Sequence, residues 1–292
     1  MEAGVMAVIT TQSSRTRQVA RAALRALYDE LCLYPKPGLV SKVDNGSHDD
    51  MQPATFIKSL FSLRHYFAAI YCAGTRKADF SELTQLGLAA EATMLRATAG
   101  VNTHRGAIFN LGLLCAAAGS ADLINACDEH TQPDLAQILM NSWGAAIKLA
   151  DSADRSSSHG NLVCRKYAVG GARGEAAAGF PHVFKIGLPT LRLIQHVGGT
   201  PEAARCQAFF AIMAALEDTN LLHRGGAEGL SYARTSAISF LAAGGVFARD
   251  WQQHAADIHH AFVARHLSPG GSADLLAATI FVDALTTRVV QA

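Results

Sequence analysis

Apolar residues recur at helical spacing along most of the 292-residue chain. The segments Leu24–Leu31 and Phe56–Ile70 place an apolar side chain every three or four positions, which is the pattern of a helix with one buried face. Alanine, the residue with the highest helix propensity, supplies much of the remainder. Further helices are predicted over Ser81–Ala99, Gly106–Ala118, Pro133–Asp151, Pro201–Ala215, Gly229–Ala243, Asp250–His266 and Ser272–Val289.

No segment alternates β-branched and polar residues as a half-buried strand would, so the pattern predicts an all-α fold. The length suits one compact helical catalytic domain over residues 19–292, after a flexible N-terminus over residues 1–18. Pro35 and Pro37 should end the first helix, because proline lacks an amide donor and restricts the preceding residue. The uncharged run Gly106–Ala121 is shorter than the roughly 18–20 residues that span a bilayer and is expected to form a buried core helix.

Charge and cysteine content narrow the classes of function. Lys plus Arg number 25 against 24 Asp plus Glu, so no overall field attracts nucleic acid or an acidic membrane, and an anionic ligand must be neutralised locally. The six cysteines include no C-x-x-C pair, which fits neither a disulfide framework nor a zinc site. The first 18 residues lack the features of an export signal. We therefore expect a reduced, cytoplasmic protein that binds neither nucleic acid nor a membrane.

The loop Tyr34–Met51 is the first candidate ligand-binding segment. It joins the rigid sequence Pro-Lys-Pro-Gly to dense mixed charge, including Lys36, Lys42, Asp49 and Asp50. A solvated linker would also be polar. Ligand sites, however, favour loops on a rigid scaffold, which favours a functional role here.

The segment Gly100–Asn110 is the second. It places Asn102, Thr103, His104 and Arg105 directly before a predicted buried helix. Helix N-termini bind phosphate through free amides and the positive end of the dipole. Ordinary capping by the asparagine or threonine is the alternative, and capping and anion binding can coexist.

The segment Arg165–His182 is the third. Arg165 and Arg173 flank a glycine-rich turn that leads to Glu175. A phosphate cradle is compatible with this composition, but the spacing is neither that of a P-loop nor that of a Rossmann unit.

The segment Leu216–Gly226 is the fourth. Glu217, Asn220 and Arg224 would share one helical face if a helix ran through them, since their spacings are three and four. A surface stripe of ion pairs is the alternative, because such pairs are common and weak. The remaining candidates in this segment are Asp218, His223, Gly225 and Gly226.

These four segments, with Ser268–Ala277, closely resemble the triphosphoribosyl-dephospho-CoA synthase family over about residues 20–286. Three blocks that occur in order carry the resemblance: P-K-P-G-L-V, G-V-N-T-H-R-G-A-I-F and E-D-T-N-L-L-x-R-G-G. The N-G-S-H-x-D-M variant in the first loop resembles the malonate decarboxylase branch more than the citrate lyase branch.

The resemblance implies transfer of the triphosphoribosyl group of ATP to the ribose 2′-hydroxyl of 3′-dephospho-CoA, with release of adenine. The product would be the prosthetic-group precursor for the acyl carrier protein of malonate decarboxylase, and the same reaction serving citrate lyase stays open. A downstream carrier-protein transferase would consume the product, and a homodimer is left open. Cleavage at the anomeric carbon passes through an oxocarbenium-like state, so carboxylates near the sugar and a donor to the departing base are required.

The candidate residues are assigned roles on that basis. Hard oxygen ligands suit Mg²⁺, the expected cofactor that accompanies ATP. Histidine can be tuned across working pH and is a candidate donor to adenine, although a structural role is equally open. The catalytic candidates are Glu175, Glu217, Asp218, His104 and His223; the substrate-binding candidates are Lys36, Lys42, Asn102, Thr103, Arg105, Arg165, Arg173, Asn220, Arg224, Gly225 and Gly226; and the metal candidates are Asp49, Asp50, Glu217 and Asp218.

Two other functions remain compatible with the sequence. A helical, metal-dependent hydrolase of ADP-ribose-like bonds would also place acids at helix junctions, and would cleave nucleotide without an acceptor. A helical adaptor for a carrier protein or a decarboxylase subunit would bind no ATP. The charged glycine junctions argue against a plain scaffold, whose connections need only caps and turns.

Overall fold

The computed structural model describes residues 2–127, 134–153 and 159–287. These residues form helices and connecting loops without a strand, which confirms the all-α prediction. In chain order the elements are α1 (Glu2–Cys32), α2 (Pro53–Ser62), α3 (Tyr66–Thr75), α4 (Phe80–Ala97), α5 (Arg105–Cys127), α6 (Leu135–Leu139), η1 (Met140–Gly144), α7 (Ala145–Ala153), α8 (His159–Tyr167), α9 (Gly171–Ala177), η2 (His182–Gly187), α10 (Leu188–His196), α11 (Pro201–Ala215), α12 (Thr219–Ala242), η3 (Gly245–Phe247), α13 (Trp251–Val263) and α14 (Gly270–Thr286).

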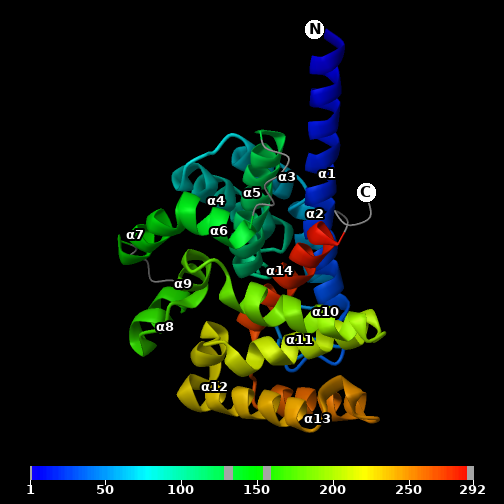
Figure 1. The fold of residues 1–292 in the computed structure, drawn as a ribbon. Helices are drawn as coiled ribbons and strands as arrows, with labels where there is room; N and C mark the ends of the chain where they lie inside the picture. The colour runs from blue at the N-terminus through cyan, green and yellow to red at the C-terminus, as the bar shows by residue number, and fades with distance from the viewer. Residues whose placement is uncertain (1, 128–133, 154–158, 288–292) are drawn as a thin grey trace.

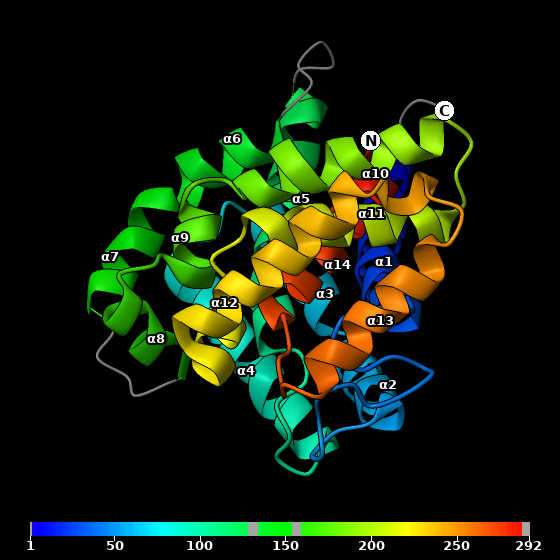
Figure 2. The ribbon, with the colours of Figure 1, turned by 90° about the horizontal axis from the view of Figure 1, so that it is seen from below.

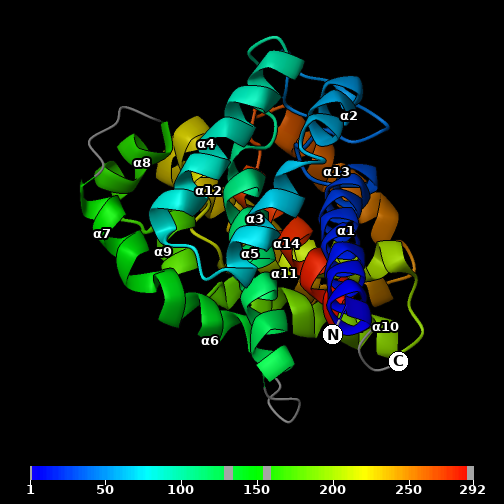
Figure 3. The ribbon, with the colours of Figure 1, turned by 90° about the horizontal axis from the view of Figure 1, so that it is seen from above.

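The last helix, α14, runs through the middle of the molecule. It packs against α1, α5, α11 and η2, and the view from above shows it among these neighbours (Figure 3). Its residues 275–282 are all buried, as expected of a helix that is apolar all round. The first and last helices of the chain are therefore direct neighbours.

The other helices form layers around this centre. Helix α1 extends upward beyond the rest of the fold, while α12 and α13 form the lower layer (Figure 1). Seen from below, α12 and α13 cross the front of the molecule, with α11 behind them (Figure 2). Helices α7, α8 and α9 lie together on one side (Figure 1).

The bounds of several elements differ from the prediction. The predicted helix Phe56–Ile70 is divided into α2 and α3 by a turn at residues 63–65. The glycines at 225–229 lie inside α12, where Gly226 adopts φ 62° and kinks the helix without ending it. Helices α8, α9 and α10 were not predicted, because glycine and polar residues obscure the apolar period between residues 159 and 196. The predicted bounds Pro133 and Val289 lie outside the described residues.

Helix α5 passes a simple test for a membrane span. Its 21-residue segment Arg105–Asn125 is the one stretch of the described chain that is long and apolar enough, and 78% of the tested window is buried inside the protein. This burial is that of a core helix, as predicted for residues 106–121.

Candidate active site

A buried ion pair lies at the end of α1. Ala23, Ala26 and Leu27 are buried, and Glu30 continues their face one turn later, so its carboxylate also points into the protein. Lys36 enters from the following loop with 1% of its surface exposed. Its Nζ donates to the Glu30 backbone oxygen at 2.9 Å and contacts the Glu30 carboxylate. Each charge therefore compensates the other where water cannot.

The loop that carries Lys36 is fixed by α13. The ring of His259 is buried and contacts the Lys36 carbonyl oxygen through Nδ1 at 2.9 Å and the Asp44 carboxylate through Nε2 at 3.1 Å. The hydroxyl of Ser47 donates to the Leu267 carbonyl at 2.7 Å. His259 thus holds the backbone of the first motif in place.

Asp274 lies opposite the start of α5. A Cβ atom built on Gly106 would come within 2.0 Å of Asp274 Oδ2, so glycine is needed for this close approach. The Asp274 carboxyl accepts a hydrogen bond from the Ala107 amide. Burial, followed by the charges of Glu30 and Asp218, raises its pKa well above the ordinary value, which favours the neutral acid. Asp274 as a whole residue is only partly buried, although its carboxyl is desolvated.

Asp218 joins the start of α12 to the start of α14. Its Oδ1 accepts from the amides of Asn220 at 2.9 Å and Gly271 at 3.3 Å. Its Oδ2 accepts from the amide and the hydroxyl of Ser272, at 2.8 and 3.0 Å. Burial raises the Asp218 pKa, and the four hydrogen bonds oppose that shift. Both carboxylate oxygens therefore already accept hydrogen bonds from the first residues of α12 and α14, which leaves them little capacity to bind another ligand.

His104 precedes α5 and is buried. Its Nδ1 lies 2.6 Å from the hydroxyl of Ser59, and the Phe56 ring packs edge-on against the imidazole. Burial, with a smaller contribution from the Lys36 charge, lowers the His104 pKa to about 3. The ring is therefore neutral at physiological pH. It can donate a hydrogen bond but is not a pre-protonated acid.

The structure thus brings residues from three of the four sequence motifs into one place. Lys36 affects the pKa of His104, and Asp218 and Glu30 both affect that of Asp274, so these five groups form a connected cluster. We call Glu30, Lys36, His104, Asp218 and Asp274 the central cluster. It contains three carboxyl groups and one lysine.

Two members of the central cluster were not predicted. Asp274 is a lone charge in the apolar run of α14, and Glu30 falls on the apolar face of α1. A charged residue at a core position is rarely left without a partner or a function. That signal could have identified both residues.

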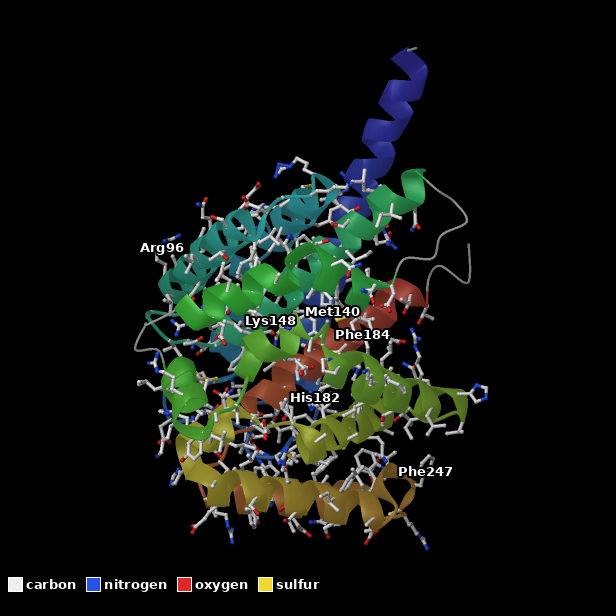
Figure 4. All side chains as sticks on the ribbon, turned by 60° about the vertical axis from the view of Figure 1, so that its left-hand side comes forward. Arg96, Met140, Lys148, His182, Phe184 and Phe247 are labelled. Carbon is white, nitrogen blue, oxygen red and sulfur yellow. The ribbon has the colours of Figure 1, made fainter. Side chains whose placement is uncertain are left out.

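Glu175 belongs to a separate pair. Its two carboxylate oxygens accept from the His182 amide at 2.8 Å and contact His182 Nδ1 at 2.7 Å. Figure 4 labels His182, whose side chain is partly exposed. A hydrogen bond joins His182 to the Ala215 backbone, and Arg234 donates to the Ala215 carbonyl at 2.6 Å. The pair therefore reaches the segment that precedes Asp218, but no direct contact links Glu175 to the central cluster.

The fourth motif does not form the predicted shared face. Helix α12 begins at Thr219, so Glu217 lies before it and is exposed. Arg224 donates to the carbonyl oxygens of Ser47 and His266, each at 3.1 Å, and its guanidinium lies 3.1 Å from the His48 ring. Its structural role is to tie two loops together.

The remaining residues of this motif take separate positions. Asn220 lies against Gly270, where a Cβ would come within 2.7 Å of its amide nitrogen. His223 is exposed on α12. Gly225 faces Leu267, and Gly226 provides the kink.

Other predicted binding residues lie around the site or away from it. Asn102 caps α5 by accepting from the Arg105 amide at 3.2 Å, and Arg105 pairs with Glu91 of α4. Lys42 is exposed over the Tyr28 ring, with 4.5 Å from its Nζ to the ring centre. Arg165 is exposed on α8, and Arg173 pairs with Asp151 at 3.6 Å.

The predicted metal ligands are not gathered. Asp49 and Asp50 are exposed in the first loop, and their charges act on Arg224. Within residues 2–127, 134–153 and 159–287, no group of three or more His, Cys, Asp or Glu side chains is placed to hold a metal ion. A metal held mainly by protein ligands is therefore not indicated for this part of the chain.

Comparison with known proteins identifies the family. The family model described as ATP:dephospho-CoA triphosphoribosyl transferase matches residues 16–291. A protein of Stutzerimonas stutzeri is 41% identical over 288 residues, covering 96% of both chains, and one of Acinetobacter calcoaceticus is 39% identical over 264 residues, covering 89% of this chain and 88% of the relative. Both are named probable 2-(5''-triphosphoribosyl)-3'-dephosphocoenzyme-A synthase. No solved structure matches. The chain belongs to the ATP:dephospho-CoA triphosphoribosyl transferase family.

Proposed function

We propose that the central cluster is where the triphosphoribosyl group passes from ATP to the 2′-hydroxyl of 3′-dephospho-CoA, with release of adenine. The observation that carries this proposal is the convergence of Glu30, Asp218 and Asp274 from three helices, with Lys36 paired to Glu30. An oxocarbenium-like ribosyl centre carries developing positive charge, and carboxyl groups nearby stabilise it.

The chain's own residues have distinct parts in this reaction. Lys36 offsets the Glu30 charge and keeps the loop of the first motif against the site. Asp218 fixes the relative position of α12 and α14, since its oxygens cap both. The amides at the start of α5 face the same region, and a helix N-terminus is suited to an anionic substrate group. The triphosphate is expected to meet Arg165, Arg173 and Arg224, none of which is buried.

Mg²⁺ is proposed to arrive with ATP. In nucleotide enzymes this ion is held by substrate phosphates and one or two carboxylates, and does not require a cage of protein ligands. Asp49 and Asp50 fit that role, since both are exposed beside Arg224 at the rim. The bound ion would neutralise phosphate charge; Glu217 is the further exposed candidate.

Within the family's pathways, we propose the malonate decarboxylase branch. The support is the N-G-S-H-x-D-M sequence, whose histidine, His48, contacts Ser268 at 2.9 Å and so lies where the first loop meets the start of α14. The product should be accepted by the carrier protein of malonate decarboxylase, through its transferase, faster than by that of citrate lyase. Equal or reversed rates would contradict this assignment.

Mass spectrometry of the reaction products tests the main proposal. Incubation with ATP, Mg²⁺ and 3′-dephospho-CoA should give free adenine and a product that retains all three phosphates. ADP or pyrophosphate in place of adenine would contradict cleavage at the anomeric carbon. Omission of 3′-dephospho-CoA should abolish adenine release, whereas unchanged release would favour a hydrolase.

A further inference from the structure

Three buried polar atoms near the start of α5 lack a hydrogen-bond partner. In the part of the chain that the structure describes, Nε2 of His104, Oδ1 of Asn110 and Oγ1 of Thr103 are among the few such atoms. His104 and Asn110 are each only 3% exposed. Unpaired polar atoms cost about 1–3 kcal/mol each when buried, so their retention beside a site indicates a ligand that completes them.

These atoms belong to the start of α5 and the turn before it, the part of the chain that Asp274 approaches at Gly106. Gly106 faces Asp274, and Asn110 is one turn further along the same face of α5. Thr103 and His104 occupy the turn that leads into this helix. Asp274, Gly106 and Thr103 are each only partly buried as residues, whereas the unpartnered Thr103 and His104 atoms are themselves buried.

Hydrogen bonding fixes what His104 offers. The Ser59 hydroxyl lies 2.6 Å from His104 Nδ1, and we assign the serine as the donor and the ring nitrogen as the acceptor, which gives the hydroxyl hydrogen a partner. The neutral imidazole then carries its hydrogen on Nε2, which is the unpartnered atom. The site therefore presents one donor from His104 and one acceptor from Asn110.

The three carboxyl groups of the central cluster differ in what they can still do. Asp218 already accepts four hydrogen bonds, and Glu30 is bound by Lys36. Of the groups that affect the Asp274 pKa, one donates a hydrogen bond to the carboxyl, the Ala107 amide. Burial and the two neighbouring acids favour the neutral form of Asp274. Only Asp274 has both a proton to give and free capacity afterwards.

We propose that His104, Asn110, Thr103 and Asp274 form the subsite for the purine of ATP, in which Asp274 is the catalytic acid that protonates the departing adenine. This inference rests on the proposed function and assigns a part of that site. Adenine matches the lining, because its ring nitrogens accept hydrogen bonds and its 6-amino group donates to an acceptor such as Asn110 Oδ1.

The proposed transfer step conserves protons and electrons. The bond between the ribosyl C1′ and purine N9 breaks with its electron pair on the purine, and the Asp274 proton passes to a purine ring nitrogen. The 2′-hydroxyl oxygen of the acceptor then bonds to C1′. Its proton returns to the Asp274 carboxylate, which restores the acid for the next turnover. General acid catalysis of this type contributes typically 10²–10⁴-fold.

Asp274→Asn is the decisive variant, because it keeps shape and removes the proton. Adenine release from ATP and 3′-dephospho-CoA should fall at least about 100-fold in kcat, while the Kd for ATP-Mg²⁺ stays within about threefold. The matched control is Asp283→Asn on the same helix, whose carboxylate instead pairs with Arg192 at 3.0 Å. The control should retain near-normal turnover.

The pH profile separates an acid from a structural residue. The charged groups that act on Asp274 are Glu30 of α1 and Asp218 at the start of α12; Lys36 lies one contact further away, paired with Glu30, and His104 precedes the same helix as Gly106. Since the protonated form is required, wild-type kcat should fall as pH rises through the raised pKa of Asp274. The residual activity of Asp274→Asn should lack this limb. Turnover within threefold of the wild type, or an unchanged limb, would overturn the assignment.

Adenine itself probes the subsite. By calorimetry, Asn110→Ala should weaken adenine binding at least about tenfold, and Asn141→Ala, a change at an exposed asparagine near α6, should not. Equal affinities would overturn the purine subsite, provided that both variants melt as cooperatively as the wild type. If the wild type releases no adenine at all, the proposed function fails; if the wild type is active and Asp274→Asn matches it, this inference alone fails.

Discussion

Gly106 has no side chain where the Asp274 carboxyl approaches α5. In Gly106→Ala, the new Cβ would lie 2.0 Å from Oδ2 and 3.0 Å from Cγ of Asp274, so the acid must rotate out of position. We expect kcat to fall about 100-fold with the fold intact, since only the end of one side chain moves. The control is Gly87→Ala in α4, whose Cβ would meet nothing closer than 3.7 Å and should stabilise the helix by about 0.5–1 kcal/mol. Steady-state rates and urea unfolding of both variants provide the comparison.

The Lys36–Glu30 pair is buried on both sides, with 1% and 7% of the side chains exposed. Lys36→Met would leave the Glu30 carboxylate buried without its counter-charge, and breaking such a pair costs about 3–5 kcal/mol. Urea denaturation should show this loss for the single variant and a large recovery in Lys36→Met with Glu30→Gln. Additive losses in the double variant would mean that the two side chains do not depend on one another.

At the scale of elements, His182 couples α9, α11 and α12. Glu175 of α9 contacts the His182 ring. His182 also hydrogen-bonds to the backbone of Ala215 at the end of α11, and Arg234 of α12 donates to the Ala215 carbonyl. The bond to Glu175 raises the His182 pKa, against burial and the repulsion of Arg234. A raised histidine pKa gives stability that is complete below about pH 6.5 and is lost as pH rises through the folded value.

Unfolding free energy measured between pH 6 and 9 should therefore decline across that window. Glu175→Gln should flatten this part of the curve, because the amide does not stabilise the imidazolium charge. The matched control is His254→Asn, on α13 away from this contact. A decline of the same steepness in Glu175→Gln would assign the pH dependence to another group.

The sequence predicted those helices that have a clear apolar periodicity or a clear boundary residue such as proline. Pro201–Ala215 was predicted with the bounds that the structure has, because proline starts it and apolar spacing runs through it. The apolar period at Phe56–Ile70 continues through the break at residues 63–65, so periodicity alone could not divide α2 from α3. The helices between residues 159 and 196 were missed because tertiary contacts, and not a strong local period, order the glycine-rich stretch.

The site was predictable only where it lies at helix junctions. Lys36, His104 and Asp218 belong to motifs whose polar residues contrast with the helices around them. Glu30 and Asp274 lie within helices, and they act on one another although one belongs to the first helix of the chain and the other to the last. The roles of Glu175, Glu217 and His223 stay predictions that the amide and alanine variants can test by adenine release.

For the whole molecule, two cysteines report on global opening. Cys115 and Cys206 are fully buried, and burial raises the pKa of each thiol. A thiol that is neutral and enclosed is unreactive, so iodoacetamide should label both only when the core opens. Their labelling rates, followed by peptide mass spectrometry, should be equal and should rise together with urea. Cys72, which is only partly buried, should react earlier, and rapid labelling of Cys206 in the native protein would contradict the packed core.

The contact between the first and last helices also constrains when the protein becomes competent. Glu30 is among the earliest residues of the site to be synthesised, and Asp274 lies near the end of the chain. During translation α1 must wait, with a charged residue on its apolar face, until α14 leaves the ribosome and fills the centre. A chain truncated before α14 would have neither a completed core nor Asp274, so we expect it to be inactive.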